Sequence, residues 1–254
     1  MCLALVALRT HPHYPLVVAA NRDEFHRRPA AAAGWWPEGW LAGRDLQAGG
    51  TWLGVTPAGR WALVTNVREP GRHDPRAPSR GTLVPRFLAH DGDAASGVAA
   101  AVDSAAAGNG FNLIGGVGAT AVWGSNRAPE PRTLVPGIHG LSNAQLDTPW
   151  PKLRRSTAAV QQWCASGDDS LDTLLALLDD RERAPNDELP ATGIPVEWER
   201  RLSAPFIVGD DYGTRCSTVF ALDHDRTLEF VERSFATDGT PTGDVRLRFR
   251  LQQR

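Results

Sequence analysis

Alternating apolar runs and turn residues open the chain and predict paired, buried strands. Apolar runs cover Leu3 to Leu8 and Leu16 to Ala20, and the HPHYP segment between them has the composition of a turn. A second pair is predicted over Trp52 to Val55 and Trp61 to Thr65, with the bend at residues 57–59. Because each pair is joined by a short turn, we expect antiparallel pairing in both.

The remaining pattern alternates between helices and strands. We expect helices over residues 79–90, 94–107, 148–165 and 171–178, strands over 111–117, 120–123, 216–222, 228–233 and 245–251, and polar loops over 71–79 and 181–195. Helix 148–165 is best supported, because Thr148 can cap it and two prolines fit its first turn. The order favours a layered α+β fold with mostly antiparallel sheets, as a single domain over residues 1–254. Four layers, with two sheets between helices, would suit a chain of this size.

Composition narrows the possible functions. The chain has 254 residues, 42% hydrophobic and 22% charged, with a formal net charge of -2. This charge favours neither nucleic acid nor an anionic membrane surface, and no apolar run reaches the length of a membrane span. Three widely spaced cysteines form no disulfide framework, and the first twenty residues lack the basic start of a signal peptide. We therefore expect a cytoplasmic protein.

Cys2 is the first candidate for chemistry. Removal of Met1 before a small residue would leave a thiol and a free α-amine on the same residue. The amine has a pKa of about 8 and the thiol about 8.5, so the amine can take the thiol proton and later return it to a leaving group. The alternative is that Cys2 is a small apolar residue at the start of a buried strand.

Polar residues at strand ends supply further candidates. Asn21, Arg22, Asp23 and Glu24 follow a buried strand directly, where Arg22 can hold a carboxylate or polarise a carbonyl. The alternative is a solvated turn. Because a strand alternates its faces, the sequence leaves open whether Asp23 or Glu24 points into a site.

Two asparagines and a late arginine complete the set. Asn66 ends a predicted strand and Asn143 follows a Gly-Leu-Ser turn; amide donors at such places can form an oxyanion hole, although asparagine is also a common turn residue. Arg215 precedes a predicted strand and can anchor an anionic group or form an internal ion pair.

A series of segments occurs in a fixed order along nearly the whole chain. They are Met1-Cys2, AANRDEFHRRP (19–29), GRDLQAGGTWLGV (43–55), ALVTNVR (62–68), SRG (79–81), FNLIGG (111–116), HGLSNAQLDTPWPKL (139–153) and YGTRCSTV (212–219). Each is weak evidence alone, but their number and order resemble the NRDE-motif family, also called the transport and Golgi organization 2 family. The resemblance implies an N-terminal-nucleophile fold, a four-layered αββα sandwich whose nucleophile begins the first strand.

A more distant resemblance to cysteine acylases of the cholylglycine-hydrolase type implies roles for the candidates. Cys2 would be the nucleophile, Arg22 and Asp23 would orient and activate it, Asn66 would supply the oxyanion donor, Asn143 would position the amine or the substrate, and Arg215 would support the site. We further expect Asn21, Glu24 and Trp52 to contact the substrate. The acylases run arginine, asparagine, any residue, aspartate, whereas here asparagine precedes arginine and the acids follow at once.

Three functions remain open. The first is an amidohydrolase that cleaves a non-peptide carbon–nitrogen or thioester bond of a small acyl or amide substrate. The second is a non-catalytic protein on the same scaffold that binds an apolar ligand, with haem and lipid or acyl-CoA as the ligands that the family resemblance suggests. The third is a structural or trafficking partner, to which the family name points, although the sequence has no coiled coil, anchor or low-complexity tail. The histidines show no metal-ligand spacing, so we expect no resident metal and no obligatory cofactor. The sequence does not indicate an oligomeric state.

Overall fold

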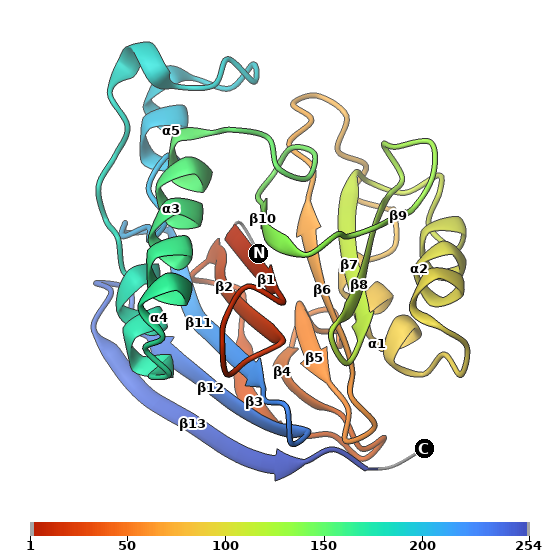
Figure 1. Cartoon of the computed structure of the whole chain (residues 1–254). Helices are drawn as coiled ribbons and strands as arrows, with labels where there is room; N and C mark the ends of the chain where they lie inside the picture. The colour runs from red at the N-terminus through yellow and green to blue at the C-terminus, as the bar shows by residue number, and fades with distance from the viewer. Residues whose placement is uncertain (1–2, 253–254) are drawn as a thin grey trace.

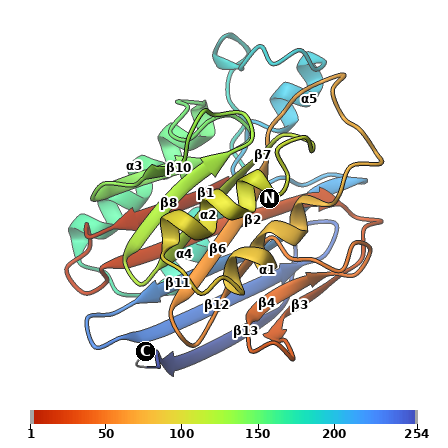
Figure 2. The same cartoon turned by 90° about the vertical axis from the view of Figure 1, so that its right-hand side faces the viewer.

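Two antiparallel sheets face each other, and helices cover the outer face of each (Figures 1 and 2). The computed structural model describes residues 3–252. The first sheet has the order β10 (Gly137–Leu141), β1 (Leu3–Leu8), β2 (Leu16–Phe25), β11 (Tyr212–Leu222), β12 (Thr227–Phe235) and β13 (Pro241–Arg250). The second has the order β3 (Ala30–Trp35), β4 (Leu41–Asp45), β5 (Leu53–Val55), β6 (Arg60–Asn66), β7 (Phe111–Val117), β8 (Thr120–Ser125) and β9 (Arg132–Thr133).

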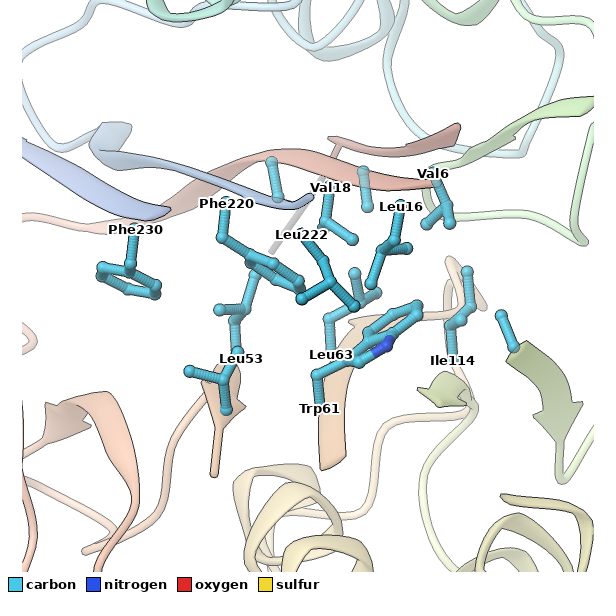
Figure 3. Packing of buried hydrophobic residues seen from close by; sticks show 14 of the residues in the cluster. Val6, Leu16, Val18, Leu53, Trp61, Leu63, Ile114, Phe220, Leu222 and Phe230 are labelled. Atoms are coloured by element: carbon cyan, nitrogen blue, oxygen red, sulfur yellow. The ribbon is translucent and has the colours of Figure 1, made fainter. Parts of the chain in front are cut away.

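Three apolar layers follow from strand alternation. Along β1 and β2, even-numbered residues such as Val6 and Val18 pack between the sheets, where they approach Trp61 and Leu63 (Figure 3). Odd-numbered residues of the same strands pack instead against α3 (Pro151–Ser166) and α4 (Leu171–Leu178). The outer face of the second sheet is covered by α1 (Leu83–Leu88) and α2 (Ala94–Asp103). The predicted α+β class and its four αββα layers are confirmed.

The helices begin and end near their predicted bounds for local reasons. The helix predicted over 148–165 begins at Pro151 and ends before Gly167, whose φ of 70° suits glycine. The helix predicted over 94–107 ends at Asp103, and the segment 79–90 forms a 3-10 turn, Arg80–Thr82, followed by α1. Another short helix, α5 (Val196–Arg201), and a 3-10 turn, Asn186–Glu188, lie in or after the predicted loop 181–195.

Within residues 3–252 no helix combines the length and the apolar character needed to cross a membrane.

Candidate active site

A cavity of about 400 Å³ lies at the edge where β2, β4 and β6 end. Arg22 and Glu24 from β2, Asp45 from β4 and Asn66 from β6 contribute to its wall. The segment 73–81 forms much of the remaining lining. The first described residue of β1, Leu3, pairs with Asn21 and so lies at the same edge of the first sheet. Strand ends from both sheets therefore meet at the cavity, and β1 begins at the same edge.

Strand alternation decides which of the four polar residues at 21–24 face the cavity. Arg22 and Glu24 share the even parity of the residues that pack between the sheets, and both line the cavity. Asn21 and Asp23 have the odd parity of the face that packs against the helices. The question left open by the sequence is thus answered for position: Glu24, not Asp23, lies on the cavity wall.

Asn21 and Asp23 are instead held in buried hydrogen bonds outside the cavity. The Asn21 amide donates to the carbonyls of Leu178 and Pro205, both at 2.9 Å, and accepts from Ser217 Oγ at 2.6 Å. Asp23 accepts from Thr214 Oγ1 at 2.7 Å. These bonds join β2 to β11 and to the helical layer. We expected Asn21 to contact the substrate, but it does not line the cavity.

Arg22 lies at the base of the cavity between an aromatic ring and a carboxylate. Its side chain is 4% exposed, its guanidinium carbon lies 4.4 Å from the Trp52 ring centroid, and its Nη2 lies 3.5 Å from Asp45 Oδ2. The same Asp45 oxygen accepts from Arg28 Nε at 2.6 Å. Burial alone would raise the pKa of Asp45, but the Ala48 N–H and the Arg28 guanidinium outweigh it and hold this pKa below its usual value. Asp45 is therefore ionised and fixes both arginines.

Two N–H donors at the base of the cavity are unsatisfied. Among residues 3–252, Arg22 Nη1 and Trp52 Nε1 are buried and have no hydrogen-bond partner. A buried donor without an acceptor costs about 1–3 kcal/mol. Since both side chains line the cavity, an acceptor bound there would offset this cost.

Asn66 and Asn143 lie next to each other, but only Asn66 lines the cavity. Asn143 Nδ2 donates to the backbone carbonyl of Asn66 at 2.9 Å, and its own carbonyl accepts from Arg68 N at 2.8 Å. Asn143 therefore fixes the backbone at the end of β6, from which Asn66 contributes to the cavity wall.

Arg215 acts on the backbone and does not line the cavity. It lies at the irregularity in the β2–β11 register, and its Nη1 donates to the carbonyls of Phe25, His26 and Arg28, each at 3.2 Å. Burial, and secondarily the charge of Arg22, lowers the pKa of its guanidinium. Neither predicted role, an anion anchor or an ion pair, describes these contacts; Arg215 holds the turn that carries Arg28.

Several residues at the cavity were missed by sequence reasoning. Arg28 lies in the segment 19–29 and Asp45 in the segment 43–55, and both line the cavity. The resemblance to cysteine acylases assigned a role to neither residue. Glu232 was also missed: it is buried behind Arg22, accepts from Ala33 N at 2.6 Å and Thr218 Oγ1 at 2.9 Å, and burial raises its pKa. Its position on β12 ties the first sheet to β3 of the second.

Close approaches at two glycines explain why the segment 43–55 contains glycine and how it meets the segment 79–81. A Cβ on Gly50 would lie 2.4 Å from the Gly81 carbonyl oxygen, so the GG and SRG segments meet where Thr51 N donates to Gly81 O at 3.0 Å. A Cβ on Gly43 would lie 2.2 Å from the Trp52 ring. Both close approaches shape the cavity wall.

We expect Gly43→Ala to lower the free energy of unfolding by about 1–3 kcal/mol, because the added methyl group forces the Trp52 ring aside. Urea denaturation measures the change. Gly34→Ala is the matched control, since a Cβ at Gly34 meets nothing within 4 Å. Equal stability of the two variants would show that Gly43 is not required for the position of Trp52.

The other described thiols are unsuited to catalysis. Cys164 and Cys216 are free and buried, and burial raises the pKa of each. Cys2 itself lies outside the described residues. Within residues 3–252 no group of three or more His, Cys, Asp and Glu side chains is placed to hold a metal ion.

Comparisons with known proteins agree with this architecture. The family model described as "Transport and Golgi organisation 2" matches residues 1–237. The chain is 38% identical to a Bos taurus protein named "Transport and Golgi organization protein 2 homolog", with 94% of each chain covered, and 35% identical to a Mus musculus "Transport and Golgi organization 2 homolog", with 89% of each covered. Among solved structures, a Caenorhabditis elegans N-acylethanolamine-hydrolyzing acid amidase ortholog matches with a TM-score of 0.50 at 12% identity, covering 87% of this chain and 92% of that one. At this identity the match shows a shared fold alone.

Proposed function

The chain belongs to the transport and Golgi organisation 2 family, and from that premise we propose that it is a cysteine N-terminal-nucleophile hydrolase that cleaves a non-peptide amide or a thioester bond. One observation carries the proposal: the edge at which β1 begins also holds a cavity whose base contains a buried arginine with an unsatisfied donor. Unsatisfied buried donors are costly in a purely structural protein and useful where charge develops during a reaction.

The direction of β1 supports Cys2 as the nucleophile. Ala4, Val6 and Leu8 pack between the two sheets, the side on which Arg22 lies, whereas Leu3 and Leu5 pack against the helices. Even parity at the start of β1 is thus the parity of the cavity face. The proposal requires that the Cys2 thiol, outside the described residues, reach this face.

The proposed reaction uses the α-amine of Cys2 as the base. The amine accepts the thiol proton, and the positive charge of Arg22 favours the resulting thiolate. The thiolate attacks the carbonyl carbon, and the Asn66 amide donates to the oxyanion of the tetrahedral intermediate. As the carbon–nitrogen or carbon–sulfur bond breaks, the ammonium group returns its proton to the leaving group. Water then attacks the acyl-enzyme while the amine takes a proton from that water. The bond from the carbonyl carbon to the Cys2 sulfur breaks, the acid is released, and the ammonium returns its proton to the Cys2 thiolate, which restores the thiol and the free amine.

A non-catalytic role in binding haem or acyl-CoA is the second candidate, and one observation favours its haem form. His73 lies on the cavity wall, where an imidazole could ligate iron. The charged lining of the same cavity fits an apolar ligand poorly. A saturable Soret shift on haem titration that is lost in His73→Ala would favour this candidate over the hydrolase.

Displacing the amine from Cys2 while keeping the thiol tests the hydrolase directly. Two proteins are released from a cleavable fusion, one beginning at Cys2 and one with an additional glycine before it, and intact mass confirms each terminus. We expect the extended protein to hydrolyse amide, N-acyl and acyl-thioester substrates at least about 100-fold more slowly, because general base catalysis contributes this much or more. Equal rates would contradict the role of the amine as the base. If neither protein turned over any of these substrates, the proposed hydrolase activity would be contradicted.

A further inference from the structure

We propose that the cavity takes a compact acyl group bearing a carboxylate, and that Arg22 and Trp52 hold this carboxylate at its base. The inference rests on the proposed function and names the substrate class of that site. It depends on three properties of the cavity: its size, the charge of its walls and the pair of unsatisfied donors.

The cavity is small and polar. Its volume of about 400 Å³ lies at the lower end of the usual range for ligand sites. Glu24 and Arg28 form one part of the wall, while His73 and Asp74 lie on another. A long alkyl chain would desolvate the charged side chains of Glu24, Arg28 and Asp74 without giving them partners, which is unfavourable. A short, hydrophilic acyl group can enter without this cost.

The base of the cavity holds two donors that no residue within 3–252 satisfies. Arg22 Nη1 and Trp52 Nε1 are both unpartnered among the described residues, on side chains that are 4% and 6% exposed. The guanidinium carbon lies 4.4 Å from the Trp52 ring centroid, so the two donors belong to side chains in direct contact. Asp45 occupies the Nη2 side of the guanidinium and leaves Nη1 for the ligand. A carboxylate has two acceptor oxygens and gains most from a charged donor, so it fits this pair best.

Binding of unreactive acids tests the inference independently of turnover. Glutarate, its neutral diamide and octanoate are titrated into the protein by calorimetry at constant ionic strength. We expect glutarate to bind at least tenfold more tightly than either of the others, because the diamide has no charged acceptor and octanoate brings a long chain. Tighter binding of octanoate or of the diamide, or no binding of glutarate, would overturn the proposal.

Trp52→Phe removes the indole donor and keeps an aromatic ring over Arg22. We expect this variant to bind glutarate about tenfold more weakly, as for one lost hydrogen bond to a charged acceptor. Trp35→Phe is the matched control, because Trp35 is exposed on β3 and does not line the cavity. Unchanged affinity in folded Trp52→Phe protein would overturn the role of the indole; if this variant does not fold, the ligand series in the wild type decides.

The outcomes separate this inference from the proposed function. Tight glutarate binding without hydrolysis of any acyl substrate would sink the hydrolase and leave the carboxylate site in place. Hydrolysis of an octanoyl amide as fast as that of a glutaryl half-amide would sink the carboxylate site and leave the hydrolase in place.

Discussion

Replacing Cys2 with alanine will abolish hydrolysis of whichever amide or thioester substrate the wild-type protein turns over fastest. The variant keeps the α-amine, Arg22 and the cavity but has no nucleophile to form the acyl-enzyme. We expect kcat/KM to fall at least about 1,000-fold, since loss of a nucleophile removes the whole covalent route. Initial rates at several substrate concentrations measure the loss, and thermal unfolding shows whether the fold is kept.

Cys164→Ala is the matched control for this substitution. Cys164 is a buried thiol in the apolar layer between β1 and the helices, where it accepts from Thr10 Oγ1 at 3.6 Å. It does not line the cavity. We expect its removal to affect stability but not kcat/KM. Iodoacetamide should correspondingly label Cys2 first, because burial raises the pKa values of Cys164 and Cys216. Turnover by Cys2→Ala at the wild-type rate would reject the cysteine hydrolase and leave only the scaffold.

Periodicity predicted most of the fold because the buried elements have unambiguous patterns. The strand predicted over Leu3 to Leu8 has the observed bounds of β1, and the helix predicted over 171–178 has those of α4. In contrast, β3 and β4 were not predicted. Their sequences, AAAAGW and LAGRD, are rich in alanine and glycine, and β3 is an edge strand with exposed residues, so neither shows strand alternation.

The candidate site was predicted less completely, because its geometry depends on which face of a strand each residue occupies. Sequence reasoning selected Arg22, Asn66 and Trp52, which line the cavity. It also selected Asn21, whose amide nitrogen donates to two backbone carbonyls on the opposite face of the sheet. The contact of Asp45 with Arg22 joins opposite sheets and is invisible to any local pattern. Residues at strand ends could thus be nominated, but their partners across the sandwich could not.

Replacing Asn66 with alanine is the second large expected effect. Asn66 ends β6 on the cavity wall, and its proposed task is to donate from its amide to the oxyanion. We expect kcat to fall about 100- to 1,000-fold, equivalent to about 3–4 kcal/mol of transition-state stabilisation, with little change in KM. The fold should persist, because Asn143 bonds to the backbone carbonyl of Asn66, which alanine retains. Steady-state kinetics and thermal unfolding measure the two quantities.

The comparison with Asn143→Ala distinguishes a donor to the oxyanion from a residue that merely supports it. Among the described residues, Asn143 meets the cavity wall through its bond to the Asn66 carbonyl, so its loss should lower the unfolding temperature as well as kcat. Asn186→Ala, at an exposed 3-10 turn where the side chain accepts from Arg200 Nε at 2.9 Å, should leave kcat unchanged. If Asn66→Ala lowers kcat by less than twofold, the oxyanion must be held by donors other than the Asn66 amide, and the assignment of Asn66 as the oxyanion donor is wrong.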